Sequence, residues 1–325
     1  MSPQVLSGDL LTAGAQRTLI PLQAREDRNT MTIGQALLQA AGRLSLSGIL
    51  GARTEAERLL CHVLGCKRHE LFIRSNEELS AGALSEFLDC AGRRALREPL
   101  QYIIGKEEFR GLEFKVTRDT LIPRPETELL VEQAVLLAKT LEITDGYGGI
   151  FIDLCTGSGC VAVCLAKEIP SAVVYAADIS KSALETAREN AKRHGVADRV
   201  IFVEGDLFDP LLPFDLYGKA SFILSNPPYV AKADFENLQP EIKDYEPAGA
   251  LLAGLDGLEF YRRIIPGSLD YLKQGGYLIM EAGCGQAEDL LKLIEENGMF
   301  TGMEFIKDQH GIDRVLRARK AAARL

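Results

Sequence analysis

The sequence lacks the long apolar runs of membrane proteins and the evenly paired cysteines of many secreted proteins. No apolar stretch approaches the roughly 18 residues of a membrane-spanning helix. The seven cysteines are an odd number with no apolar signal segment ahead of them, so we expect free thiols in a reducing, cytoplasmic environment. At 325 residues and 46% hydrophobic content, the chain is expected to be globular, with two or three domains.

Histidine is also scarce, which limits the kinds of active site that depend on histidine. The four histidines are scattered, which gives no support to a nucleophilic triad. Cys61, His62, Cys66 and His69 lie close together, but the Cys-x-x-Cys pairs of a structural zinc site are absent. We therefore predict helix-packing cysteines and surface histidines there, and no metal.

The chain has no excess of basic residues either. It carries 37 Lys and Arg against 46 Asp and Glu, a net charge of −9. Residues 31–120 have a net charge of +1, whereas residues 121–325 have −10. Because proteins that bind nucleic acids neutralise phosphates with a basic surface, this distribution argues against a direct nucleic-acid partner.

The pattern along the chain predicts an amino-terminal helical part and a carboxyl-terminal α/β part. Residues 1–30 are polar and without periodicity, and we expect a disordered extension. Residues 31–98 have helical periodicity and are expected to form a helical domain. Residues 99–121 are predicted to be a linker that contains a β-hairpin, and residues 122–325 a second, catalytic domain.

Local signals place the caps and the hairpin. Thr54 and Glu57 have the spacing of a capping box, and Ser80 is expected to cap a later helix. The hairpin is predicted between Phe109 and Val116, with its turn at Gly111. The acidic residues after the Pro-Arg-Pro segment suit the first turn of a helix.

From residue 150 onward, short apolar runs alternate with helical patterns. Strands are predicted at 150–154, 173–177, 200–203, 222–224 and 277–280, helices at 160–168, 181–194, 258–272 and 286–297, and a closing hairpin at 302–306 and 313–318. Alternating units of this kind pack helices on both faces of a parallel sheet. The predicted fold class is α/β, a doubly wound, Rossmann-like sheet of seven strands with a closing antiparallel hairpin.

The apolar run Phe222 to Ser225 is followed at once by the tetrapeptide Asn226-Pro227-Pro228-Tyr229. Two consecutive prolines end a strand, so these side chains are held at its carboxyl end, where open α/β sheets bind ligands. The Asn226 side-chain oxygen and the Pro227 carbonyl are acceptors for the two hydrogens of a planar –NH2 group. Asn-Pro is also common in turns, so these residues alone leave both interpretations open.

Glycines and carboxylates follow the preceding strands. Gly157 and Gly159 form a turn whose backbone N–H groups can approach a ligand, but the third glycine of a dinucleotide fingerprint is absent. Asp178 ends the second strand, where a carboxylate can bind ribose hydroxyls, and Asp206 and Leu207 follow the third. The series predicts a nucleoside cofactor without a pyrophosphate. The cationic S-adenosylmethionine fits acidic surroundings.

With these motifs the chain resembles the release factor glutamine methyltransferases, the PrmC (HemK) family of class I methyltransferases. The resemblance covers residue 32 to the end. It rests on the glycine turn, the tetrapeptide, Glu98 to Gly105, Leu121 to Glu128, Tyr245 to Pro247 and Gly254 to Leu258.

The resemblance implies an enzyme with a defined substrate. Its activity would be methyl transfer from S-adenosylmethionine to the side-chain amide nitrogen (N5) of the glutamine in the Gly-Gly-Gln motif of class 1 peptide-chain release factors. The product of the cofactor would be S-adenosylhomocysteine. The amino-terminal helices would recognise the substrate.

The resemblance also implies roles for individual residues. The implied cofactor-binding residues are Cys155, Thr156, Gly157, Ser158, Gly159, Asp178, Asp206, Leu207 and Asn226. Asn226, Pro227 and Tyr229 would be catalytic, and Asn226, Pro227, Pro228, Tyr229, Arg124 and Pro125 would bind the substrate. Cys155 stands where the family usually has glycine, and a cysteine can be accommodated there if its φ is negative.

Three alternatives remain at this stage. A ribosomal-protein glutamine methyltransferase would use the same chemistry on another protein, although the Pro-Arg-Pro segment favours the release-factor branch. An adenine-N6 methyltransferase would also grip an amino group, but it would need a basic surface. A regulator would bind S-adenosylmethionine without transferring its methyl group.

Overall fold

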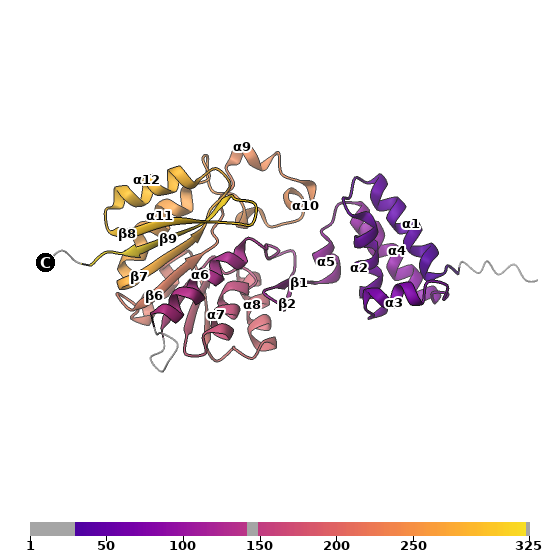
Figure 1. Cartoon of the computed structure of the whole chain (residues 1–325), viewed down its shortest axis with the longest axis horizontal. Helices are drawn as coiled ribbons and strands as arrows, with labels where there is room; N and C mark the ends of the chain where they lie inside the picture. Colours follow the sequence, from indigo (N-terminus) through magenta and orange to yellow (C-terminus); the bar gives the residue numbers. More distant parts are fainter. Residues whose placement is uncertain (1–29, 142–148, 323–325) are drawn as a thin grey trace, which may run out of the picture.

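The computed structural model describes residues 30–141 and 149–322, so the predicted extension over residues 1–30 lies, except for Thr30, outside the described residues. Figure 1 shows a helical unit and an α/β unit, with a short helix and a hairpin between them. Among the described residues, no helix is both long and apolar enough to cross a membrane.

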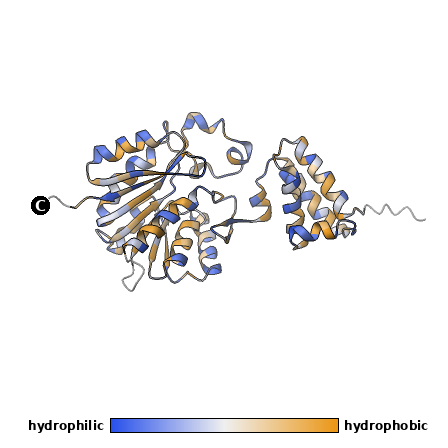
Figure 2. Cartoon of the chain, viewed as in Figure 1, coloured by the Kyte–Doolittle hydropathy of each residue, from blue (hydrophilic) through white to orange (hydrophobic). Residues whose placement is uncertain are grey.

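The amino-terminal unit is a bundle of short helices. They are α1 (Ile33–Leu46), α2 (Ala52–Leu64), α3 (Arg68–Ile73), α4 (Ala81–Ala95) and α5 (Leu100–Ile104). Their apolar sides meet in one buried cluster around Leu37, Leu59 and Phe87. Figure 2 shows apolar and polar residues alternating along these ribbons, as expected for helices with one buried face.

The predicted capping box at Thr54 and Glu57 is wrong. Helix α2 begins earlier, after Gly51 in a left-handed conformation (φ 68°), so Thr54 lies within the first turn. Glu57 is buried instead and pairs with Arg53 at 2.7 Å and Arg68 at 2.6 Å. The helix begins at a glycine that adopts the left-handed conformation and needs no side-chain cap. The capping-box spacing of Thr54 and Glu57 is therefore a coincidence.

A capping box does occur at the start of α1. The Thr32 hydroxyl accepts from the Gln35 backbone N–H at 3.3 Å, and the Gln35 side chain accepts from the Thr32 N–H at 3.0 Å. The expected cap of α4 is confirmed, since the Ser80 hydroxyl accepts from the Ala83 N–H at 3.2 Å.

The predicted hairpin joins the two units as strands β1 (Lys106–Phe109) and β2 (Leu112–Lys115). Both turn residues, Arg110 and Gly111, have positive φ, which matches the twist of a tight hairpin. The Asn190 amide holds this hairpin to the rest of the chain. It accepts from the Lys115 N–H at 2.8 Å and donates to the carbonyls of Lys115 and Ser158 at 3.0 and 2.9 Å.

The carboxyl-terminal unit is built on one sheet, in which the described residues form seven strands in the order β5-β4-β3-β6-β7-β9-β8. The strands are β3 (Ile150–Leu154), β4 (Val173–Asp178), β5 (Val200–Glu204), β6 (Ala220–Ser225), β7 (Leu272–Glu281), β8 (Phe300–Lys307) and β9 (Asp313–Lys320). Strand β9 is antiparallel to both of its neighbours, and the other pairs are parallel. The predicted fold class is confirmed.

Helices cover both faces of this sheet (Figure 1). They are α6 (Thr127–Thr140), α7 (Cys160–Glu168), α8 (Lys181–Arg193), α11 (Glu259–Tyr271) and α12 (Ala287–Asn297). Alternating strand residues enter two separate cores: Phe151 and Phe222 pack with α6 and α7, and Ile152 and Ile223 pack with α11 and α12.

Two connections at the carboxyl ends of the strands carry short helices that the sequence did not predict. After β5 comes the 3₁₀ segment η1 (Asp209–Phe214). Between β6 and α11, the chain makes a long excursion with α9 (Lys232–Phe235), α10 (Pro240–Lys243) and η2 (Ala248–Ala250). We call residues 230–258 the β6–α11 loop. The strand order reverses between β3 and β6, the position where open α/β sheets form a ligand-binding crevice.

Candidate functional site

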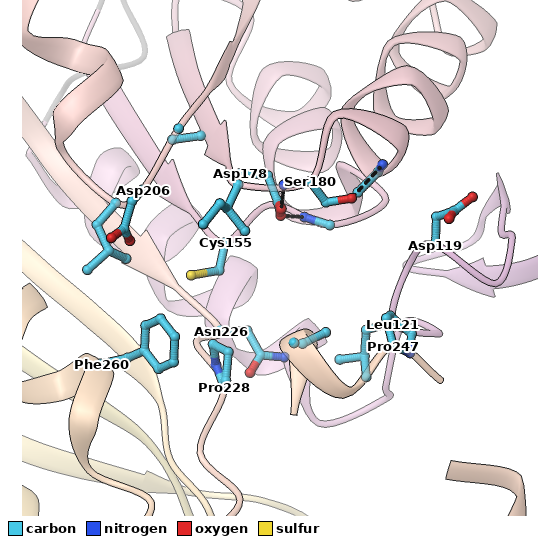
Figure 3. Close-up of a pocket in the computed structure, with 18 of the residues that line it drawn as sticks. Asp119, Leu121, Cys155, Asp178, Ser180, Asp206, Asn226, Pro228, Pro247 and Phe260 are labelled. Atoms are coloured by element: carbon cyan, nitrogen blue, oxygen red, sulfur yellow. Dashed lines mark hydrogen bonds between the residues drawn. The ribbon is translucent and has the colours of Figure 1, made fainter. Parts of the chain in front are cut away.

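A cavity of about 340 Å³ lies at the carboxyl ends of β3 to β6 (Figure 3). We call it the strand-end cavity. Of the predicted cofactor-binding residues, it is lined by Cys155, Gly157, Asp178, Asp206, Leu207 and Asn226. Figure 3 shows the Cys155 sulfur and the Asn226 amide facing a common space between Asp206 and Pro247. The structure thus brings together residues from four separate strand ends.

Asp178 organises the glycine turn. Its two carboxylate oxygens accept backbone N–H groups, from Gly157 at 2.7 Å and from Ser180 at 2.9 Å. Burial raises the pKa of Asp178. Because each carboxylate oxygen has a second lone pair, Asp178 can still accept hydroxyl groups of a ligand while it holds the turn.

Three predicted cofactor-binding residues do not line the strand-end cavity: Thr156, Ser158 and Gly159. Thr156 and Ser158 line a smaller cavity of about 40 Å³ beside Asn226. The Thr156 hydroxyl donates to Asp153 at 2.5 Å, and burial raises the pKa of Asp153 to about 7. A Cβ on Gly159 would lie 2.9 Å from the Ala187 Cβ, so this glycine allows α7 and α8 to pack closely.

The condition of a negative φ at Cys155 is not met in the structure. Cys155 has a φ of 60°, in the left-handed region, which costs a residue with a Cβ about 1 kcal/mol or more. Its thiol lines the strand-end cavity, and burial raises the pKa of that thiol well above its usual value. The raised pKa favours the neutral thiol over a nucleophilic thiolate at this position.

Sequence reasoning missed several residues in the wall of the strand-end cavity. They are Asp119, Leu121, Ile179, Pro247, Phe260 and Arg263. Arg263 pairs with the predicted Asp206 at 2.5 Å. The sequence signal for Ile179 was its place directly after the predicted Asp178, and in the structure its side chain is 72% exposed. Phe260 carried none, since one aromatic on an amphipathic helix is not distinctive.

The tetrapeptide separates the strand-end cavity from a second one. This tetrapeptide cavity has a volume of about 130 Å³ and is lined by Asn226, Pro227, Tyr229, Arg124 and residues of the β6–α11 loop. Asn226 lines both cavities, whereas Pro228 faces the strand-end cavity. Pro125 is exposed and lines neither of them, so its role stays a prediction.

The end of the tetrapeptide is fixed by backbone contacts. The Gln286 side chain donates to the Tyr229 carbonyl at 3.0 Å and accepts from the Gly283 N–H at 3.0 Å. A Cβ on Gly283 would lie 3.0 Å from the Tyr229 ring, so the ring lies against the backbone there. Burial raises the pKa of Tyr229, which keeps its phenol neutral.

Ion pairs hold the far wall of the tetrapeptide cavity. Arg124, in the Pro-Arg-Pro segment, pairs with the buried Glu246 of the β6–α11 loop. Glu241 in the same loop binds two arginines of the helical unit, Arg94 at 3.0 Å and Arg97 at 2.6 Å. The wall therefore depends on side chains from three distant parts of the chain.

Families with a helical domain and a methyltransferase domain match this chain. A model of the PrmC N-terminal domain matches residues 35–105, and a model of the methyltransferase small domain matches residues 131–242. The release factor glutamine methyltransferase of Geobacter sulfurreducens is 43% identical over 290 residues, which cover 89% of this chain and 96% of the relative. That of Moorella thermoacetica is 40% identical over 284 residues, covering 87% and 97%.

A solved structure shares the fold. The catalytic domain of hMettl16, in complex with MAT2A 3'UTR hairpin 6, superposes with a TM-score of 0.50 and 17% sequence identity. The match covers 76% of this chain and 84% of that chain. At this identity the likeness concerns the fold alone.

Proposed function

The chain belongs to the release factor glutamine methyltransferases, and from this we propose that it transfers the methyl group of S-adenosylmethionine to the N5 amide of the Gly-Gly-Gln glutamine in class 1 release factors. The observation that carries the proposal is the position of Asn226, whose side chain lines both the strand-end cavity and the tetrapeptide cavity. One amide can then contact a cofactor on one side and a substrate on the other.

The strand-end cavity fits S-adenosylmethionine by its chemistry. Asp178 and Asp206 offer carboxylates where a nucleoside has hydroxyl and amino groups, and Leu207 and Phe260 add apolar surface for a base. The one arginine that lines this described cavity, Arg263, is already paired with Asp206. The site is thus suited to a ligand that is cationic and has no phosphate. When bound, S-adenosylmethionine supplies an electrophilic methyl group on a positively charged sulfur.

The tetrapeptide would hold the substrate amide. The Asn226 side-chain oxygen and the Pro227 carbonyl are acceptors at the same strand end, so they can take the two hydrogens of a glutamine –NH2 group. Tyr229 would pack on the planar amide. An amide nitrogen is a poor nucleophile, and holding it in one orientation lowers the barrier by removing the entropy cost of alignment.

The same acceptors would act as the nitrogen gains a bond. The nitrogen then becomes more positive, and oxygens already directed at its hydrogens stabilise that charge without rearranging. Neither Asn226 nor Tyr229 has to lose or gain a proton in this role. We propose no general base, since the product nitrogen can lose its proton to water.

The test is methyl transfer from labelled S-adenosylmethionine to four candidate substrates. These are a purified class 1 release factor, the same factor with the Gly-Gly-Gln glutamine changed to alanine, a ribosomal protein and DNA. We expect label in the unmodified release factor and none in the alanine variant. Equal labelling of the two factors, or labelling only of ribosomal protein or DNA, would refute the proposed substrate.

A further inference from the structure

Asn226 is the first member of a buried hydrogen-bond chain that runs away from both cavities. Its side-chain nitrogen, Nδ2, donates to the Thr127 hydroxyl at 3.1 Å. The Thr127 hydroxyl donates in turn to the Glu281 carboxylate at 2.6 Å. Thr127 begins α6 and Glu281 ends β7, and both side chains are buried. Neither residue contributes to the predicted cofactor or substrate contacts.

The donors and acceptors in this hydrogen-bond chain have a fixed order, which follows from the chemistry of the three side chains. An ionised carboxylate only accepts hydrogen bonds, and a hydroxyl has a single hydrogen to donate. When Glu281 is ionised, the Thr127 hydroxyl must donate its hydrogen to the Glu281 carboxylate. Only the hydroxyl oxygen, an acceptor, is then left for Asn226. The Asn226 amide must then turn its –NH2 group toward Thr127. Its oxygen, Oδ1, is left to face the cavities.

This orientation matters for the substrate. A glutamine amide brings two N–H hydrogens and needs acceptors. An Asn226 side chain turned by 180° would present its own –NH2 group to them and would repel the substrate amide. Asparagine in isolation has little preference between the two orientations, because its oxygen and nitrogen ends have nearly the same shape.

We propose that Thr127 and Glu281 are positioning residues that hold the Asn226 amide with its oxygen toward the substrate nitrogen. The inference rests on the proposed function, since only a substrate with an amino group needs that orientation. It assigns a purpose to a buried carboxylate that the proposed methyl transfer otherwise leaves unused. Thr127 and Glu281 act only through Asn226.

The charge on Glu281 should control the direction of the chain. Burial raises the pKa of Glu281 to about 7, while the Thr127 hydrogen bond and nearby arginines lower it. The groups that face Glu281 from the surrounding elements are Thr127 and Glu126 from the start of α6, Arg124 from the Pro-Arg-Pro segment, Arg314 from β9, Tyr261 from α11, Tyr229 from the tetrapeptide and Cys160 from α7. Protonated Glu281 can donate to Thr127, which can then donate to Asn226 and favour the reversed amide.

The first test removes the hydroxyl and keeps the shape. Thr127→Val should lower kcat for release-factor methylation about tenfold, because one buried hydrogen bond no longer selects the amide orientation. Thr127→Ser keeps a hydroxyl and should recover most of the loss. The affinity for S-adenosylmethionine, measured by calorimetry, should stay within about twofold in both. A Thr127→Val enzyme with near-normal kcat would overturn the proposal.

A matched control separates orientation from general damage to the core. Thr186 is a buried threonine on α8 whose hydroxyl donates to the Ser182 carbonyl of its own helix at 3.4 Å. Thr186→Val should leave kcat unchanged, and the melting temperatures of both valine variants should be compared. An equal loss of kcat in Thr186→Val would show that the effect is structural and would also overturn the proposal.

The second test removes the charge. The stability of the correct orientation is present above the pKa of Glu281 and lost as the pH falls through it, so the wild-type kcat should fall between about pH 8 and about pH 6. Glu281→Gln should flatten this profile. Asp153 also has a pKa of about 7, so a step that persists in Glu281→Gln belongs to another group and overturns the role of the Glu281 charge.

The outcomes distinguish this inference from the proposed function. If wild-type enzyme transfers no label to the release factor, the proposed function fails and the positions of Thr127 and Glu281 have no bearing on it. If wild-type enzyme is active and Thr127→Val is equally active, the function stands and the inference fails.

Discussion

The two cavities that meet at Asn226 are built in different ways. The strand-end cavity takes its predicted residues from the ends of successive strands, where the sheet itself places them, and its polar contacts are largely to backbone N–H groups. The tetrapeptide cavity has one wall on the sheet and the other on the β6–α11 loop, which is held by the Arg124–Glu246 pair. The first cavity therefore depends chiefly on the sheet, although Pro247, Gly249 and Ala250 of the β6–α11 loop also line it, and the second depends on a few long-range side-chain contacts.

This difference suggests how each cavity responds to change. A site supported by the sheet should keep its shape when it is empty, whereas a wall supported by ion pairs can open when a protein substrate docks. Substitutions on the two sides should then separate into effects on the cofactor and effects on the release factor. Leu121, Asn226 and Ala250 line both cavities. Of these three, Asn226 is the residue whose side chain can accept a hydrogen bond, so it should affect the chemical step itself.

The largest effect is expected at Asn226. In the proposed mechanism Asn226→Ala removes an acceptor that would act chiefly in the transition state, so kcat should fall by about 10²-fold or more. The affinity for S-adenosylmethionine should change little, because Asp178 and the glycine turn remain. Steady-state kinetics together with calorimetry give both numbers, and near-normal turnover would remove Asn226 from the catalytic role.

On the cofactor side, Asp178→Ala should raise the KM for S-adenosylmethionine by about 30-fold. The change removes a charged acceptor for a ligand hydroxyl and frees the Gly157 N–H that orders the turn, each a contact to a charged group. The KM for the release factor should hardly move. Asp215→Ala, at an exposed aspartate paired only with Lys219, is the control. An unchanged cofactor KM would contradict the ribose-binding role.

On the substrate side, Arg124→Ala should raise the KM for the release factor about tenfold while cofactor affinity is preserved. The buried Glu246 would lose its cation, and the far wall of the tetrapeptide cavity would lose its anchor. Arg193→Ala removes an arginine from an exposed pair with Glu113 and should have no such effect. If Arg124→Ala changed only cofactor binding, the division between the two cavities would be wrong.

The smallest effect concerns the strain in the glycine turn. Cys155→Gly and Cys155→Ala both remove the thiol, so their difference isolates the left-handed backbone. We expect the glycine variant to be more stable by about 1 kcal/mol, measured by denaturant unfolding. Equal stabilities would mean that the positive φ at Cys155 carries no cost. No other interaction would then be needed to offset a conformational cost at Cys155.

The sheet and its helices were predictable from the sequence because their signals are local. Ile150–Leu154 and Cys160–Glu168 have the bounds expected from an apolar run and the helix after it. Strand β7 begins earlier than predicted, since Gly275 and Gly276 interrupt its apolar pattern. The short helices of the β6–α11 loop have too few turns to show periodicity.

Site residues were predictable where the local sequence pattern identifies them. They were not predictable where the site depends on a contact between two residues far apart in the sequence. Asp178 and Asn226 follow apolar runs directly, so the strand ends identify them. The pairing of Arg124 with Glu246 joins residues 122 positions apart, and neither shows its partner in the local pattern. The positive φ of Cys155 could not be predicted from the sequence, because the turn, and not the residue in it, dictates φ.

Asn190 has a consequence for communication within the molecule. Its one amide side chain bonds both the hairpin strand at Lys115 and the glycine turn at Ser158. The hairpin, which leads to the helical unit, and the glycine turn, which lies beside the strand-end cavity, are thus both hydrogen-bonded to the same side chain. If a ligand that orders the turn also stabilises the hairpin through Asn190, thermodynamic linkage requires that a protein which stabilises the hairpin strengthens binding of that ligand to the same extent.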